Sequence, residues 1–405
     1  MTRPEVLATP AVGNTLFSAF LPLLPLMLAT FAGFFPSGMA LPVVPRHVHD
    51  TLGFGTVMVG FVMGSQYIAS ILAGRALAAN TVDGRGVKLA LGLGLLGIAA
   101  VGVAYFASLS VVDRPQLSLA LLITGRLITG VAESFVITSA LSWGILRLGA
   151  EHSGKVIGWI GMALFGAYGV AAPVGSWVHG RFGLEGIAAA TVLIPLLTLA
   201  VAMRMTGVAP SHLKRPSFYR VLGDIKLPGL ALTLSSFGYA AINAFVVLYF
   251  VERGWGAAAL AFTSLGAGFI LARLLVGHWP DTIGGAKVAA LFAAVEGVGQ
   301  LLIWLSPGVV LACVGAALTG GGYALAFQGF GVEAVRRAPP QSRGAATGGY
   351  VVFQDLSMGL SGPLGGWLAL DAGLGAVYVA GAAASLAAVV LAVWMQRDTP
   401  PLARL

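Results

Sequence analysis

The chain has 405 residues, of which 58% are apolar and 9% charged, and its formal net charge at pH 7 is +8. Soluble globular proteins carry roughly 25% charged residues, so this composition excludes an ordinary water-exposed surface and indicates lipid as the surrounding medium. The positive balance does not indicate nucleic acid, because the basic residues stand in short segments between apolar runs, a pattern typical of membrane topology.

Twelve apolar runs follow one another along the chain, and a membrane-spanning helix needs roughly 20 such residues. Arg3 is followed by the first apolar run, which is too long for the core of a signal peptide. The sequence therefore predicts an all-α membrane protein with twelve transmembrane helices. The runs are 17–45, 54–78, 87–109, 117–146, 155–178, 186–206, 228–251, 258–279, 286–306, 309–335, 344–370 and 373–395.

The basic residues between these runs predict the orientation. An even number of spans puts both chain ends on one side of the membrane. With that side inside, eighteen lysines and arginines fall on inner segments and four on outer ones, namely Arg46, Arg114, Arg181 and Arg253. Inner loops of membrane proteins carry the excess of positive charge, so we expect both termini in the cytoplasm.

The longest polar connection, at about 207–227, follows the sixth span and contains His212 and four basic residues. It divides the chain into two sets of six spans. We therefore expect an N-terminal six-helix bundle at 1–206, a cytoplasmic linker at 207–227 and a C-terminal six-helix bundle at 228–405.

The two halves of the chain repeat each other. One set of matches, each 198 residues apart, pairs Arg75, Ala79, Asp83 and Gly86 with Arg273, Gly277, Asp281 and Gly284. A second set, each 190 residues apart, pairs Gly169, Pro173, Gly175 and Trp177 with Gly359, Pro363, Gly365 and Trp367. Such matches indicate a duplicated unit. Parallel repeats are the plan of a large class of transporters, in which the substrate lies near the membrane midplane between the halves.

Several motifs carry a family resemblance. Residues 79–88 resemble the inner-loop motif G-x-x-x-D-x-x-G-x-K, with Ala79 in place of the first glycine, and residues 277–287 form a second, slightly longer copy. Residues 41–45, Leu-Pro-Val-Val-Pro, resemble the end of a first helix, and Arg126-x3-Gly130 resembles an arginine motif of a fourth helix. In this order and spacing they resemble the major facilitator superfamily, which implies two pseudo-symmetric six-helix bundles and alternating access.

A narrower resemblance rests on three further segments. They are Gly125-Arg126-Leu127 with Glu133, the run 331–335, and Gln354-Asp355 ahead of Gly362-Pro363. These are similar to the YhhS/YfcJ-like group, whose members are usually described as sugar or drug exporters. The resemblance implies a location in the bacterial inner membrane.

Two ionisable residues lie inside the fourth span. Arg126 and Glu133 are seven residues apart, which puts them on one face of a helix, roughly 10 Å apart along its axis. A charge within a span is costly and is a functional candidate by default. We expect Glu133 to carry a proton or cation and Arg126 to modulate it, because burial favours a neutral carboxyl group and a nearby cation favours the charged one. The alternative is a structural polar contact between helices.

Other spans contain further polar candidates. Asp355 lies about eleven residues into the eleventh span and is the deepest acid of the second half, so we predict a role in proton coupling, with interhelical hydrogen bonding as the alternative. Uncharged polar residues within spans either line a cavity or join helices. Those predicted at a substrate cavity are Gln66, Tyr67, Tyr239, Asn243, Gln328 and Gln354.

Charged residues at the inner ends of the spans are predicted to act as a conformational gate. Asp83 is expected in a loop, where it accepts hydrogen bonds from the start of the following helix, while the basic residues hold inner segments together in one state. The alternative is that the loop charges only signal topology. The predicted gate consists of Arg75, Asp83, Arg85, Lys88, Arg273, Asp281 and Lys287.

The expected function is secondary transport of a small organic solute. Gly169-x3-Pro173-x-Gly175 resembles the antiporter motif of a fifth helix, although Ser176 stands where a second glycine is usual, and it favours proton-coupled efflux of a sugar-like or drug-like molecule. The alternatives are a proton symporter, a uniporter or a membrane sensor that does not transport.

The sequence predicts neither an enzyme nor a cofactor. The single cysteine, Cys313, excludes an intramolecular disulfide and a cysteine metal cluster. His47 and His49 are expected in a wet outer loop rather than at a metal. No phosphate-binding loop motif is present. The expected partners are the lipid bilayer, a small-molecule substrate and protons, but no nucleic acid, and the chain is expected to be a monomer.

Overall fold

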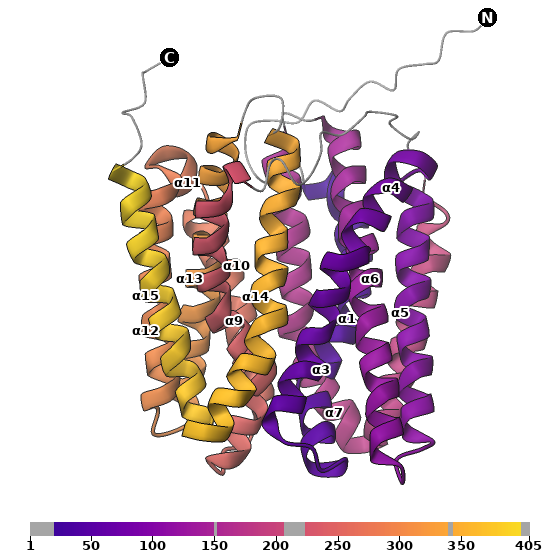
Figure 1. Cartoon of the computed structure of the whole chain (residues 1–405). Coiled ribbons are helices and arrows are strands. Elements are labelled where there is room, and N and C mark those ends of the chain that lie inside the picture. The colour runs from indigo at the N-terminus through magenta and orange to yellow at the C-terminus, as the bar shows by residue number, and fades with distance from the viewer. Residues whose placement is uncertain (1–19, 150–151, 206–222, 339–342, 398–405) are drawn as a thin grey trace, which may run out of the picture.

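The computed structural model describes residues 20–149, 152–205, 223–338 and 343–397. Figure 1 shows two helical bundles side by side, the N-terminal one in indigo to magenta and the C-terminal one in pink to yellow. The predicted linker at 207–227 lies mostly outside the described residues, so the domain boundaries 1–206 and 228–405 stay predictions.

The N-terminal bundle is built from long apolar helices, two of which contain short π-helical segments. Its elements are α1 (Phe20–Ala40), α2 (Val44–Arg46), η2 (His47–Thr51), α3 (Thr56–Ala69), η3 (Ser70–Gly74), α4 (Arg75–Arg85), α5 (Val87–Leu109), α6 (Pro115–Leu148) and α7 (Ser153–Ala202).

The C-terminal bundle has the same plan. Its elements are α9 (Lys226–Glu252), α10 (Ala259–Val276), α11 (Trp279–Thr282), α12 (Gly285–Leu305), α13 (Val309–Arg337), α14 (Arg343–Ala372) and α15 (Leu374–Arg397).

The described helices account for the twelve predicted crossings. Ten segments are long and apolar enough to span a membrane. One of them, the 50-residue α7, contains a break at Gly183, where φ is 63°, and therefore forms two crossings. The 30-residue α14 runs the length of the C-terminal bundle and forms the twelfth crossing. Large apolar side chains point outward, as at Leu72 and Val310, both 78% exposed. Because such a surface needs lipid around it, the protein is a multi-pass membrane protein.

Two predicted boundaries are wrong. The first span does not continue as one helix to residue 45, because α1 ends at Ala40 and a turn with Pro42 precedes α2. The second helix does not end at 78, because α4 carries it on to Arg85. A proline lacks the amide hydrogen that a continuing helix needs, which accounts for the first break.

The backbone repeats as the sequence does. Gly86 ends α4 with φ and ψ of 94° and 159°, and Gly284, which is 198 positions later, has 102° and 137°. Residues with a side chain rarely adopt such a positive φ. Both glycines therefore form the same turn in the two bundles. We call the side where α15 ends, and where α4 and α11 lie, the terminal side (Figure 1).

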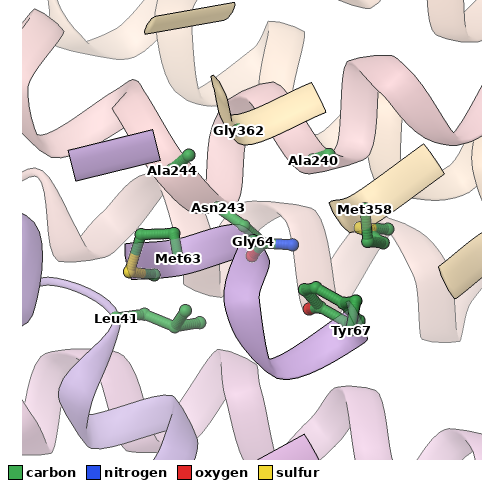
Figure 2. A pocket seen from close by; sticks show the side chains of 9 residues that line it. All are labelled: Leu41, Met63, Gly64, Tyr67, Ala240, Asn243, Ala244, Met358 and Gly362. Atoms are coloured by element: carbon green, nitrogen blue, oxygen red, sulfur yellow. The ribbon is translucent and has the colours of Figure 1, made fainter. Parts of the chain in front are cut away.

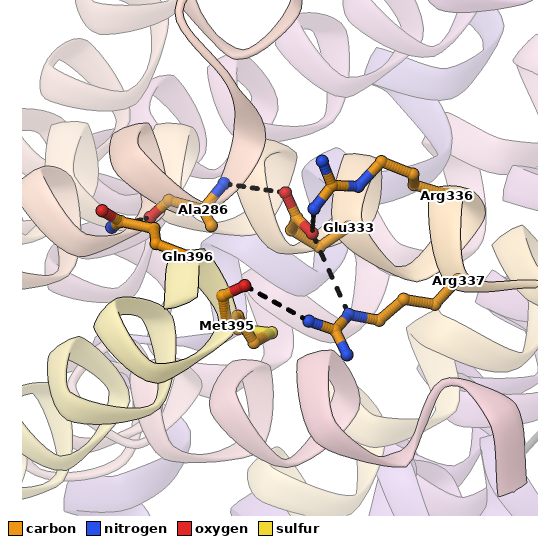
Figure 3. Close-up of polar contacts among 6 residues, drawn as sticks. All are labelled: Ala286, Glu333, Arg336, Arg337, Met395 and Gln396. Atoms are coloured by element: carbon orange, nitrogen blue, oxygen red, sulfur yellow. Dashed lines mark hydrogen bonds and ion pairs between the residues drawn. The ribbon is translucent and has the colours of Figure 1, made fainter. Parts of the chain in front are cut away.

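A buried acid braces the terminal side of the C-terminal bundle (Figure 3). Glu333 of α13 is 2% exposed and accepts a hydrogen bond of 3.1 Å from the Ala286 amide at the start of α12. It also pairs with Arg336 at 2.5 Å and with Arg337 at 3.9 Å. Arg337 donates in turn to the Met395 carbonyl of α15 at 3.5 Å. One carboxylate thus connects the ends of three helices.

The Glu333→Ala variant is expected to melt several degrees below the wild type in detergent. The change leaves the buried Ala286 amide without its acceptor, a loss of about 1–3 kcal/mol, and leaves two arginines side by side. Glu333→Gln keeps an acceptor and is expected to lose less. The control is Glu252→Ala, which removes an exposed acid at the end of α9. Equal melting temperatures for all four proteins, measured by differential scanning fluorimetry, would show that the brace contributes nothing.

Candidate functional site

An ion pair joins the two bundles. Asp355 of α14 is buried, and its Oδ2 lies 2.5 Å from Nε of Arg75 at the start of α4. The Ser70 hydroxyl donates to the same oxygen at 2.9 Å and lies 2.8 Å from the Ser134 hydroxyl of α6. The sequence predicted Asp355 as a proton site and Arg75 as a gate residue. The structure brings these two residues together as a single contact.

The π-helical segment η3 sets the geometry of this contact. Its last hydrogen bond runs from the Arg75 amide to the Ser70 carbonyl, five residues apart. In a π-helix, residues five apart lie close to one face, whereas in an α-helix they are turned well apart. Ser70 and Arg75 can therefore both reach Asp355. Such bulges are frequent at functional sites.

Gly130 lets α6 pack closely against α3, next to η3. A Cβ atom at Gly130 would overlap the Gln66 carbonyl of α3. The close approach places Ser134 against η3, where its hydroxyl donates to the Gly130 carbonyl at 2.7 Å.

The other predicted charges lie deeper in the N-terminal bundle. Arg126 is 2% exposed and Glu133 is 8% exposed, both on α6. The Arg126 guanidinium lies 3.5 Å from the Met63 carbonyl, and its Nε has no partner among the described residues. The Ser37 hydroxyl bonds to the Glu133 carboxylate, whose Oε1 also lacks a partner in the described part of the chain. Neither charge is in an ion pair there, and an unpaired buried charge is costly.

A small cavity lies between the bundles (Figure 2). Its volume is about 10 Å³, which holds one water molecule at most. Two of the residues predicted at a substrate cavity, Tyr67 and Asn243, line it. The lining residues are Leu41, Met63, Gly64, Tyr67, Ala240, Asn243, Ala244, Met358 and Gly362. Since no organic solute fits into this volume, the bundles are closed around the site.

The remaining predicted cavity residues do not line this cavity. Gln66 is buried in α3, and Gln354 of α14 is half-buried. Tyr239 of α9 stacks on Tyr323 of α13, with ring centroids 4.9 Å apart. The Gln328 amide donates to the Gly277 carbonyl at 2.9 Å and so ties α13 to the end of α10.

The predicted gate residues other than Arg75 lie near the terminal ends of the helices. Asp83 and Arg85 occupy the last turn of α4, so the predicted loop around Asp83 is wrong. Gly86, three residues after Asp83, is the glycine that ends this helix. Lys88 opens α5, and Arg273 ends α10. Asp281 lies in α11, and Lys287 is exposed near the start of α12.

The bundles also touch on the side opposite the termini. The α3 and α14 backbones meet where Gly60 faces Gly362, and the Thr56 hydroxyl donates to the Gly366 carbonyl at 2.9 Å. Between α7 and α10, the Thr263 hydroxyl donates to the Gly169 carbonyl at 2.7 Å. Along α14, Gly362 itself lines the cavity and Gly366 lies one turn farther from the terminal side, whereas Asp355 lies about one turn before Met358 of the cavity lining, toward the terminal side.

One predicted loop residue is instead buried. His47, expected in water, is 7% exposed in η2, and its Nε2 has no partner among the described residues. His49 remains exposed and lies 2.9 Å from Asp50. The short helix α2 continues directly into η2, and this turn places the His47 side chain in the protein interior.

The profile of the major facilitator superfamily matches residues 26–272 and, in an overlapping match, 229–405. The chain belongs to the major facilitator superfamily. A relative from Pseudomonas aeruginosa strain LESB58, described as an uncharacterized MFS-type transporter, is 40% identical over 388 residues, which cover 96% of each chain. Another MFS-type transporter, from Salmonella typhimurium, is 38% identical over 89% of this chain and 94% of its own.

Solved transporter structures share the fold of this MFS transporter. A D-xylose–proton symporter superposes with a TM-score of 0.74 at 16% identity, covering 94% of this chain and 98% of its own. A nucleoside transporter gives 0.72 at 15% identity, covering 92% and 99%. A human organic anion transporter gives 0.70 at 14% identity, covering 91% and 98%. At these identities the likeness shows the fold alone.

Sequence reasoning missed several residues at the MFS transporter's bundle contacts. Ser70, Ser134 and Thr263 are small polar residues within apolar spans, and nothing in their spacing distinguishes them from other serines and threonines. Phe165 of α7, whose ring stacks on Phe269 of α10 in the other bundle, was missed as well, because an aromatic residue in a span is usually only packing. The one available signal was the glycine pattern around Gly169, which marks the close approach to Thr263.

Proposed function

We propose that this MFS transporter is a secondary active transporter that exchanges protons for a small organic solute, sugar-like or drug-like, and exports it. The observation that carries the proposal is the Arg75–Asp355 pair, an ionisable contact between the two bundles. The excess of basic residues on the predicted inner segments supports a terminal side that faces the cytoplasm of a bacterial inner membrane. The pair then closes the cytoplasmic side of the site.

A proton on Asp355 would neutralise the acid and release Arg75. The cytoplasmic side could then open, deliver the proton and accept the solute. Loss of the proton would restore the pair and return the solute-loaded protein to its outward state. A ligand shifts such an equilibrium only when it binds the two states with different affinities. A proton that breaks the pair binds the open state more tightly than the closed state, so it meets this condition.

Glu133 is proposed as a second proton carrier. Its carboxylate is buried without a counter-ion in the described part of the chain. An uncompensated buried charge is costly, and a bound proton removes that cost. Arg126, two helical turns away on α6, would then act on Glu133 through its charge rather than through direct contact.

The direction of transport is supported by the antiporter-like motif. Gly169 lies at the α7–α10 contact, where its carbonyl accepts from Thr263 and where a side chain would face Gly266. A symporter or uniporter remains the alternative, since the release of Arg75 by a proton on Asp355 could equally accompany solute entry. The proposed active unit is a monomer, because the cavity lies within one chain.

The test uses proteoliposomes loaded with a pH-sensitive dye. A thermal-shift screen of sugars and amphipathic aromatics selects the solute, since binding to the folded state alone raises the melting temperature. For an antiporter, an imposed pH gradient is expected to drive the solute against the proton flow. Solute movement in the same direction as the protons would indicate symport. Solute movement that does not depend on the gradient would indicate uniport. Gradient-driven exchange that survived both Glu133→Gln and Asp355→Asn would overturn the proton sites.

A further inference from the structure

One aromatic ring of the N-terminal bundle is enclosed by three rings of the C-terminal bundle. Phe165 of α7 stacks on Phe269 of α10, with centroids 3.6 Å apart and planes 21° apart. Tyr239 of α9 and Tyr323 of α13 meet it edge-on at 5.7 and 6.4 Å. All four rings are at most 9% exposed. We call Tyr239, Phe269 and Tyr323 the aromatic cage.

The cage belongs to one bundle, whereas the ring that fills it belongs to the other. Tyr239 and Tyr323 stack on each other at 4.9 Å with planes only 11° apart, so two of its walls support each other within the C-terminal bundle. Phe165 sits one turn before Gly169, at the α7–α10 contact. When the bundles move apart there, Phe165 leaves with its own bundle and the cage loses its occupant.

The cage adjoins the central cavity and offers a buried hydroxyl group. Ala240 and Asn243, one position and one turn after Tyr239, line the cavity. The Tyr323 hydroxyl is buried beside the Ser236 hydroxyl and has no other hydrogen-bond partner in the described part of the chain. A hydroxyl donates one hydrogen bond and accepts two, so this group retains capacity for a polar substituent on a bound ring.

We infer that the aromatic cage is a subsite for a flat aromatic ring of the transported solute, and that Phe165 occupies it while the bundles are closed. The occupant stacks face to face on Phe269 and meets two ring edges, an arrangement that aromatic pairs favour. A slot of this shape fits a planar ring better than a round quaternary ammonium, which cages can also bind. The inference rests on the proposed transport function, since the subsite empties only in an open state.

The test measures binding of 1-naphthol to the full chain in lipid nanodiscs, with the signal of empty nanodiscs subtracted. Phe165→Ala removes the internal competitor and is expected to bind 1-naphthol about tenfold more tightly than the wild type, because the fraction of binding-competent protein rises. Adding Tyr323→Leu to that variant should abolish the gain. Phe182→Ala, an exposed phenylalanine on the same helix, is the control.

Three results would each overturn the inference. They are equal affinity of the Phe165→Ala variant and the wild type, equal affinity for the saturated analogue decahydro-1-naphthol, and a preference for tetramethylammonium. Size-exclusion profiles establish that every variant is folded. Phe165→Leu, which keeps an apolar side chain, covers the case in which the alanine variant fails to fold. Binding is measured without a pH gradient, so failure of proton coupling in proteoliposomes leaves this result intact.

Discussion

Replacing Asp355 with asparagine is expected to reduce gradient-driven transport by about tenfold or more, because a loss of about 1.4 kcal/mol in coupling is already a factor of ten. The variant keeps the hydrogen bond from Ser70 but can no longer pair with Arg75 or take up a proton. The terminal side should then be open in a larger fraction of molecules. Spin labels on the terminal ends of α4 and α14 would report this as a longer distance.

A charge exchange separates gating from proton coupling. The double variant Arg75→Asp with Asp355→Arg can rebuild the pair and should restore the short distance between the labels, while Arg75→Met alone should not. Asp371→Asn is the matched control, since it changes an exposed acid at the far end of α14. If Asp355→Asn kept full coupling and unchanged label distances, the pair would be only a packing contact.

A methyl group at Gly60 is expected to hold the side opposite the termini open. A Cβ atom there would overlap the Gly362 carbonyl of α14, and neither backbone can yield as a side chain does. Overpacking of this kind costs about 1–3 kcal/mol, which corresponds to a roughly fivefold to 150-fold smaller population of the closed state. Gly60→Ala should therefore transport at a small fraction of the wild-type rate.

The control for this variant is Gly161→Ala on α7, where no atom lies within 4 Å of the added methyl group. Spin labels at the far ends of α3 and α14 should separate in Gly60→Ala and stay together in Gly161→Ala. A more radical change, Gly60→Leu, should remove closure altogether. Wild-type transport by Gly60→Ala would mean that these two helices do not need to meet during the cycle.

Much of the fold could be predicted because a lipid environment imposes strong rules. Charge is rare and apolar runs are long, so the twelve crossings and their duplication are visible in the order of residues. The break at Ala40 and the extension of α4 to Arg85 were not predicted. Pro42 accounts for the first break but does not predict it, because Pro25 and Pro36 lie inside α1 without ending it. Polar residues extend α4 in the same way that apolar ones do, so nothing in the composition marks its end.

The candidate site was predicted in its parts but not in its assembly. Arg75 and Asp355 were each chosen, for different roles, and their 2.5 Å contact appears only in space. Tyr67 and Asn243 do reach the cavity, whereas Gln328 is occupied by the Gly277 carbonyl. A polar residue in a span has no mark in the sequence that distinguishes a cavity wall from a bond between helices.

The order of residues was enough to predict a membrane protein, a doubled set of helices and a resemblance to the major facilitator superfamily. These properties follow from local composition and from spacing along the chain. The pairing of the charges, the π-helical turn that brings Ser70 and Arg75 to Asp355, and the stacking of Phe165 on Phe269 of the opposite bundle became visible in the folded chain alone. Such contacts depend on how two separate bundles face each other, which no short-range pattern records.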